Sequence, residues 1–353
     1  MRVTRFFCLL IVIAGTKVHA ETTLQSTENT VTQAAFKEIL LKAANDVPFW
    51  FMTVDVTAVS AVRDTAVAEY AMLDGATPFG PVYNEVTSDQ LTAAPRISIG
   101  GTVKNGWGFQ TTYWDFSQST HRGFNGLPPG GLTGAGLEIF GESASSRAYT
   151  FDVEATRQFT TMATLFTGTL GARYALLEHT DNSMAVGIAN TASVLGPDIY
   201  TMSSQAKTGF HGTGLTYSLS GIYPTTNWLS LYGGGRLSNL FGSNEASANT
   251  HIVGTGETGR TTANAAADSS SADHLFIFEG QVGLMWHHNL KSRNSKIFAR
   301  AGFEYQYWNS PDDPAQALSS GALIPNSSAL HVVEAVDLET HFVGFSLGAG
   351  YAW

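Results

Sequence analysis

The sequence has little charge, a single cysteine and no long apolar run in its body. Charged residues make up 14% of the 353 residues, where about 25% is usual in soluble proteins. The hydrophobic content of 43% is ordinary, which argues against a disordered chain or a coiled coil. Beyond the first twenty residues no stretch approaches the ~18 consecutive apolar residues that a membrane-spanning helix needs. This excludes a helical membrane protein.

The first twenty residues have the pattern of a secretory signal peptide. Arg2 and Arg5 precede an apolar run over 6–15, and Ala20 ends a short small-residue cleavage site. We therefore predict a cleaved signal peptide over 1–20. The only cysteine, Cys8, lies inside it, so the exported chain has no disulfide. The net charge of -10 disfavours a nucleic-acid partner, which calls for a basic face.

The carboxyl end alternates strictly between two kinds of residue. One parity is apolar and the other is small, without the charges that the outer face of a soluble sheet carries. The apolar parity holds Val343, Phe345, Leu347, Ala349, Tyr351 and Trp353. The final Ser346, Gly348, Tyr351 and Trp353 resemble the ending that the outer-membrane barrel assembly machinery reads, which predicts that machinery as a partner.

Alternating segments of this kind recur along the chain and predict an all-β, antiparallel transmembrane barrel of about ten strands, with 8 or 12 as alternatives. The ten segments lie near 49–60, 95–103, 107–117, 147–159, 166–179, 208–223, 228–241, 272–288, 296–309 and 337–353. Short connections alternate with five long polar ones, at 61–94, 118–146, 180–207, 242–271 and 310–336. The alternation predicts an outer-membrane location with every long loop extracellular and both termini periplasmic. A helical pattern over 29–45 predicts a short N-terminal helix within an arm at 21–48, before the barrel at 49–353.

Tryptophans are expected to mark the two lipid interfaces, because the indole ring has an apolar body and a polar N–H. Five fall near strand ends on the short-turn side: Trp50, Trp107, Trp228, Trp286 and Trp353. Trp114 and Trp308 are placed at the opposite end.

Where apolar parity marks lipid, the other parity marks the lumen. It holds both signs of charge. The predicted lumen-lining residues are Asp55, Arg96, Asp152, Glu154, Arg173, Arg236, Glu279, Gln281, Arg300, Glu304 and Gln306. Side chains fill a barrel of about eight strands and leave a channel at sixteen, so ten strands admit two outcomes. We expect a narrow hydrophilic pore for ions or small solutes, with charges on opposite walls. The alternative is a closed barrel, structural or adhesive, that acts through its external loops.

Several strands resemble the Legionella-type major outer membrane protein family, a pore-forming family with many planctomycete members. The resemblance rests on 96–101, 105–108 and 113–116, then on the Asp-Val-Glu-Ala-Thr-Arg strand at 152–157, and on 171–175, 278–280, 299–308 and 345–351. It covers most strands and few loops. It implies an outer-membrane barrel of porin type and no catalytic residues.

We expect no enzyme activity, cofactor or metal. The glycine-rich stretches 123–136 and 254–259 lack the Gly-Lys-Ser/Thr ending of a phosphate loop. His287 and His288 have no further ligands at metal-site spacing. Asp312 and Asp313 stand between prolines and indicate a turn rather than a calcium site.

One enzymatic alternative remains, a surface protease of the omptin type. Such an enzyme uses acids and a histidine at the extracellular rim to activate water. The candidates are His179 with Asp181, and Asp273 with His274.

Overall fold

The computed structural model describes most of the chain from residue 49 onward. The described ranges are 49–63, 68–73, 91–125, 135–161, 164–189, 198–256, 259–290, 295–310, 317–323, 329–335 and 339–353. The predicted signal peptide and helical arm lie outside these ranges. Among the described residues, no helix is long and apolar enough to cross a membrane.

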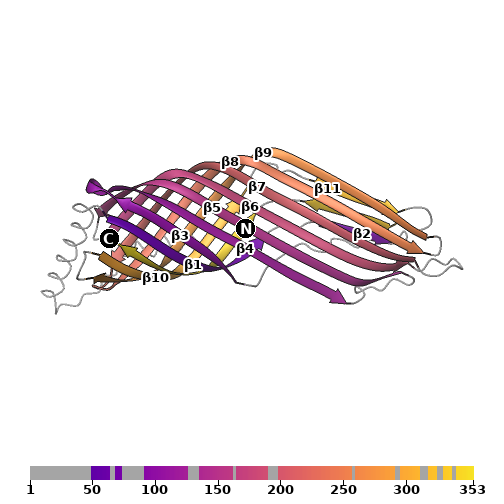
Figure 1. Ribbon diagram of the computed structural model, residues 1–353, viewed down its shortest axis with the longest axis horizontal. Coiled ribbons are helices and arrows are strands. Elements are labelled where there is room, and N and C mark those ends of the chain that lie inside the picture. The colour runs from indigo at the N-terminus through magenta and orange to yellow at the C-terminus, as the bar shows by residue number, and fades with distance from the viewer. Residues whose placement is uncertain are drawn as a thin grey trace, which may run out of the picture. The chain divides into compact units, whose positions relative to one another are not determined.

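Ten antiparallel strands close into a barrel (Figure 1). They are β1 (Phe49–Arg63), β3 (Thr92–Thr102), β4 (Trp107–Asn125), β5 (Ala135–Thr161), β6 (Thr164–Ala189), β7 (Asp198–Pro224), β8 (Leu229–Gly256), β9 (Gly259–Leu290), β10 (Ser295–Asn309) and β13 (Thr340–Ala352). Around the wall their order is β1-β13-β10-β9-β8-β7-β6-β5-β4-β3, and β3 pairs with β1 to complete the ring. Two backbone bonds of 2.9 Å between Trp50 and Trp353 join the chain's first and last strands. The predicted ten-stranded antiparallel barrel is confirmed.

An Asn-Gly pair makes the tight turn between β3 and β4. Asn105 and Gly106 both have φ near 73°, in the one-turn 3-10 helix η1 (Lys104–Gly106). Asparagine and glycine tolerate this left-handed region better than other residues do. The turn therefore follows directly from the local sequence.

The outer face of the barrel carries a continuous apolar belt. Leu284 is 51% exposed, Phe303 39% and Leu347 66%, which no soluble protein of this size would leave uncovered on every strand. Because the ring is closed, the backbone groups of these strands pair with neighbours and none of the wall has an edge within the belt. Trp50, Trp107, Trp228, Trp286 and Trp353, all 41–55% exposed, lie at its short-turn end.

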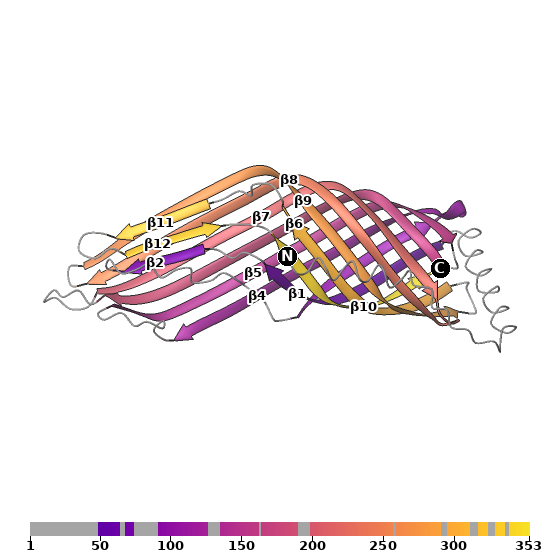
Figure 2. The ribbon, with the colours of Figure 1, turned by 180° about the vertical axis from the view of Figure 1, so that it is seen from behind.

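The wall is much taller on one side than on the other. Strands β5 to β9 have 26 to 32 residues each, where a tilted span needs ~9–11. The pairing of β9 with β10 ends at Phe276 and Asn309, whereas its pairing with β8 continues to Gly259 and Gly256. Strands β4 to β9 therefore continue past the belt as an open sheet, which we call the extension (Figures 1 and 2).

Three of the predicted long loops are consequently wrong in large part. Most of 180–207, most of 118–146 and nearly all of 242–271 are strand. Beyond the belt most residues on both faces of the sheet are polar or small, with a few exceptions such as Met184 and Ile252, so the alternation that signals a strand is weak there. The backbone pairing continues without it.

A second sheet of three short strands is built from the other two predicted loops. It has the order β11-β12-β2, from β11 (Ala317–Leu323), β12 (Ala329–Ala335) and β2 (Ala68–Leu73). Its Ala317 packs in a cluster with Ala206, Ala246 and Ala248, which face inward on β7 and β8. The Thr250 hydroxyl of β8 donates to the Ser319 carbonyl, 3.5 Å away. The small sheet thus backs the inner face of the extension.

Candidate functional site

The charged residues predicted to line the lumen all point into the barrel. They are four arginines and five acids: Arg96, Arg173, Arg236 and Arg300, with Asp55, Asp152, Glu154, Glu279 and Glu304. Every one of them is ion-paired with at least one other member of the set. We call this set the charged layer.

Five members form a network between the β5–β6 and β8–β9 sides of the wall. Arg173 holds both oxygens of Asp152, at 2.6 and 2.8 Å, and also binds Glu279 of β9. Arg236 of β8 donates to Asp152 at 2.7 Å and to Glu154 at 2.8 Å. Asp152 and Arg173 are 0% and 1% exposed, so the pair between these two residues is shielded from water. A pore would hold these arginines and carboxylates on opposite walls, whereas here they contact one another directly.

The remaining four form two further pairs on the other side. Arg96 of β3 binds Glu304 of β10 through both terminal guanidinium nitrogens, at 2.9 and 2.5 Å. Arg300 of β10 binds Asp55 of β1 through two hydrogen bonds as well, at 2.6 and 2.5 Å. Gln306 donates to Glu304 at 2.8 Å. Such bidentate pairs fix both partners in position.

Inward-facing glycines make room for these side chains. A Cβ at Gly348 would lie 1.6 Å from the Asp55 carboxylate, and one at Gly302 would lie 2.5 Å from the Tyr232 hydroxyl. Even a methyl group does not fit at these positions unless a neighbour moves. Glycine at these positions therefore lets Asp55 and Tyr232 approach the opposite backbone closely.

An apolar layer crosses the barrel beyond the charged layer. It was not predicted. All ten wall strands contribute, with Val59, Ala61, Ala94, Trp114, Phe116, Ala148, Ala175, Leu177, Phe210, Leu240, Leu275, Ile277, Trp308 and Phe342, each at most 3% exposed. On every strand with members of both layers, the apolar residue lies farther from the short-turn end.

Aromatic rings close the centre of the apolar layer. The Trp114 ring of β4 lies 6.0 Å from Trp308 of β10 and 5.5 Å from Phe342 of β13, centroid to centroid. Phe116 meets Phe342 at 5.0 Å. Strands β4 and β10 are not neighbours in the wall, so these contacts bridge the interior.

The prediction that Trp114 and Trp308 mark a lipid interface is therefore wrong. They are 1% and 0% exposed and face inward. Their place near a strand end suggested an interface, but their parity is that of the lumen residues Thr112 and Gln306. The sequence parity therefore already indicated that both side chains face inward.

A polar layer follows beyond the apolar one. The ring nitrogens of His179 lie 3.0 Å from the Ser146 hydroxyl and 2.9 Å from the Thr340 hydroxyl, which links β6 to β5 and to β13. Asp273 accepts from Asn244 at 3.2 Å and from Ser310. These groups tie the strands together at the base of the extension.

This arrangement separates one pair of the protease candidates, Asp273 and His274, and buries the histidine of the other. Asp273 points inward, whereas the His274 ring lies outward beside Phe241, 6.4 Å between centroids. His179 shares the inner face with Asp181, but its side chain is 4% exposed. Among the described residues no group of three or more His, Cys, Asp or Glu side chains is arranged to hold a metal. The predicted turn at Asp312 and Asp313 lies outside the described residues.

A small polar cavity remains on the short-turn side of the charged layer. Its volume is about 170 Å³, and Thr53, Ser98, Thr112 and Gln281 are among the residues that line it, beside Arg96 and Arg236. Gln281 is the one predicted lumen residue placed here without an ion-pair role. The space suits a few water molecules.

The four residues of the predicted assembly signal lie on or just after β13, at the seam with β1. Ser346 faces inward, Gly348 accommodates Asp55, and the Tyr351 hydroxyl donates to Ser295 at 3.0 Å. Trp353 is 47% exposed. Their recognition by the assembly machinery stays a prediction.

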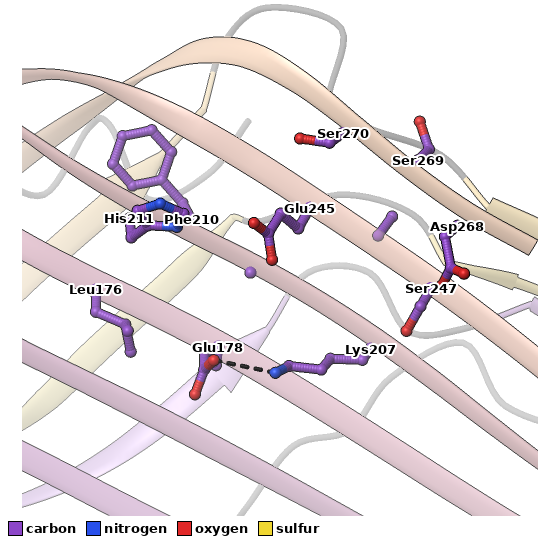
Figure 3. A pocket seen from close by; sticks show the side chains of 12 residues that line it. Leu176, Glu178, Lys207, Phe210, His211, Glu245, Ser247, Asp268, Ser269 and Ser270 are labelled. Atoms are coloured by element: carbon purple, nitrogen blue, oxygen red, sulfur yellow. Dashed lines mark ion pairs between the residues drawn. The ribbon is translucent and has the colours of Figure 1, made fainter.

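A groove of about 500 Å³ lies on the outer face, where the apolar belt gives way to the extension (Figure 3). Glu178, Lys207, Glu245 and Asp268 line it, and Lys207 pairs with Glu178 at 3.1 Å. Both partners are part-exposed, so the pair adds little stability. Sequence reasoning missed this groove because most of its residues were assigned to loops.

Comparison with known proteins finds similar folds only. No family model matches the chain, and no curated protein matches it. Solved structures with a similar fold include the outer membrane protease OmpT from Escherichia coli, at 10% identity over 86% of this chain and 97% of that one, with a TM-score of 0.38. The toluene transporter TodX of Pseudomonas putida matches at 10% identity over 88% and 91%, with a TM-score of 0.30. A major outer membrane protein of Thermus thermophilus matches at 10% over 86% and 99%, with a TM-score of 0.27. At such identities the likeness is one of fold and says nothing of activity.

Proposed function

We propose that the chain is an outer-membrane barrel without a continuous pore, which acts through the β-sheet extension that it presents at the cell surface. The observation that carries this proposal is the apolar layer, to which all ten wall strands contribute. An ion or hydrophilic solute would have to leave water to pass it, which costs several kcal/mol or more for a charge. Of the two outcomes that the sequence left open, this interior favours the closed barrel.

The charged layer supports the same conclusion. A narrow pore with a transverse field needs cations and anions held on opposite walls with water between them. Here the guanidinium of Arg173 contacts carboxylates from β5 and β9 at once. Passage through this level would require breaking buried ion pairs.

The belt and its flanks support the orientation. The tryptophan-rich end lies beside the short turns, whereas the other end leads into the extension and the small sheet. In outer-membrane barrels short turns face the periplasm and long segments face outward. We accordingly assign the extension to the cell surface and both termini to the periplasm.

Residues beyond the belt are then available for binding. The extension is a paired sheet backed by the β11-β12-β2 sheet, so side chains on its outer face are held on a rigid support, where binding residues often occur. Membership of the Legionella-type family, which would favour a pore, remains a proposal from the strand sequences alone.

An epitope inserted in the β8–β9 turn, between Gly256 and Gly259, tests the location. Antibody is expected to reach it on intact cells. The same epitope inserted at Asn227, in the short turn between β7 and β8, should be reached only after the outer membrane is permeabilised. Recovery of the protein in the soluble fraction, or equal protection of both epitopes on intact cells, would contradict the proposal.

A further inference from the structure

We infer that the outer face of the extension binds the uncharged sugars of the glycolipid beside the barrel; this inference rests on the proposed outer-membrane location. The surface is formed by neutral side chains on four neighbouring strands, which we call the amide face. It consists of Asn182 on β6, Ser203 and Gln205 on β7, Asn249 and His251 on β8, and Asn264 on β9. A groove of about 640 Å³ lies over them.

The strand register places these side chains in two adjoining rows. Asn182 pairs with Gln205, which pairs with Asn249. Ser203 pairs with His251, which pairs with Asn264. Neighbouring strands lie about 4.8 Å apart, so each row presents hydrogen-bonding groups at regular intervals across the sheet.

The amide face is outward. It has the parity of Leu176 on β6 and of Phe241 on β8, which face outward in the belt, and no register shift interrupts the β6–β7 or β7–β8 pairing between belt and face. Gln205, Asn249, His251 and Asn264 are all exposed. The opposite parity faces the small sheet behind it.

Part of the face is already oriented and part is free. The side-chain amide of Gln205 donates to the side-chain amide oxygen of Asn182 at 2.9 Å, and the His251 ring is hydrogen-bonded to the Asn264 side chain. Within the described part of the chain, the side chains of Asn249 and Ser203 make no hydrogen bond. The face therefore offers an amide and a hydroxyl for a ligand, flanked by groups whose geometry is fixed.

The chemistry of the face selects an uncharged, hydroxyl-rich ligand. Amides both donate and accept, so one side chain can bind two neighbouring hydroxyls. The groove carries no Lys, Arg, Asp or Glu, so an anionic or cationic partner finds no opposite charge there. Met184, 51% exposed, adjoins Ser203 and gives an apolar contact for the C–H face of a sugar.

The position of the face identifies the source of that sugar. Asn182 lies six residues beyond Leu176 on β6, and the outward positions between them, Glu178 and Thr180, are polar. This places it about 15 Å above the belt for a strand tilted by about 40°. The face looks sideways from the wall, toward molecules that stand in the same membrane. The charged groove of Figure 3 lies between it and the belt. We therefore assign the face to the saccharide portion of the outer-leaflet glycolipid.

The test measures binding of core oligosaccharide, released from lipopolysaccharide and made neutral by dephosphorylation and by reduction of its sugar-acid carboxyl groups, to the detergent-folded protein by calorimetry. The Gln205→Ala/Asn249→Ala variant should bind at least tenfold more weakly than the unchanged protein. Two variants serve as controls and should bind normally: Asn227→Ala, an exposed asparagine in a short turn, and Lys207→Ala in the charged groove. Heat-modifiable gel mobility verifies that every variant is folded.

Absence of binding to the unchanged protein, or equal binding by the Gln205→Ala/Asn249→Ala variant, would overturn the inference. Full competition by lipid A, which has phosphates and acyl chains but no core sugars, would overturn it as well. The binding assay uses protein in detergent, whereas the proposed location is tested by epitope exposure on intact cells. The two tests can therefore fail independently.

Discussion

Replacing Arg173 with leucine is expected to destabilise the folded barrel by about 3–5 kcal/mol, the usual cost of removing one partner from a buried ion pair. Arg173 is 1% exposed and binds both Asp152 and Glu279. Without it, Glu279 loses its direct cationic partner and Asp152 keeps only Arg236. Leucine fills part of the space but leaves the buried Asp152 and the largely buried Glu279 without the cation that joined them.

The measurement is urea unfolding of the protein in lipid vesicles, followed by tryptophan fluorescence. Arg147→Leu is the matched control, because Arg147 is exposed on the outer face and its main contact is the Tyr149 ring, 5.8 Å away. It should cost less than about 1 kcal/mol. A triple variant that also carries Asp152→Asn and Glu279→Gln should regain part of the loss. Equal stability of Arg173→Leu and Arg147→Leu would show that the charged layer is not buried as described.

Arginine on the lipid face should disrupt assembly, whereas arginine in the lumen cavity should not. Leu284 and Phe303 are ladder neighbours of Ala301 and Val282 in the middle of the belt and point outward. A charge there costs ~2–4 kcal/mol at the membrane midplane. Gln281 is next to Val282 in the sequence, but its side chain faces the cavity of about 170 Å³. An arginine side chain there can contact water and carboxylates.

Leu284→Arg, Phe303→Arg and Gln281→Arg are compared by the fraction that folds into vesicles, read from heat-modifiable gel mobility. The first two should fold poorly and the third should fold nearly as well as the unchanged protein. Equal yields for all three would contradict the assignment of faces on β9 and β10.

The side-chain parity of the belt strands could be predicted from the sequence. Along β10, apolar residues alternate with charged or small ones: Ala301, Phe303 and Tyr305 against Arg300, Gly302 and Glu304. Because one face of the strand meets lipid and the other meets the barrel interior, the apolar residues must face the lipid. That alternation located the charged residues inside. It did not show whether they meet, because partners such as Arg96 and Glu304 are 208 residues apart and their pairing depends on how wide the closed ring is.

The apolar layer was hidden by the same reasoning. In the sequence, an apolar parity predicts the lipid-facing side of a strand, so inward apolar residues such as Leu240 and Ile277 give no separate signal. Trp114 and Trp308 had the lumen parity, yet their position near strand ends suggested an interface. Aromatic residues that share the parity of the inward charged residues are the pattern that would have indicated a closed lumen.

The extension could not be predicted because most residues on both faces of its strands are polar or small, so hydrophobicity does not alternate along them. Residues 261–272 are threonine, alanine, asparagine, serine and aspartate without a period of two. Backbone pairing with β8 continues through them regardless. The amide face and the charged groove were missed for this reason, since both lie on strands that the sequence pattern assigned to loops.

The closed interior is tested most directly by single-channel conductance of the folded, signal-free protein in a planar bilayer. The unchanged protein is predicted to pass no discrete current steps. A Trp114→Ala/Trp308→Ala variant, which removes both indoles from the apolar layer, is predicted to show them. Reproducible steps from the unchanged protein, with heat-modifiable mobility proving that it is folded, would contradict a closed barrel and restore the pore.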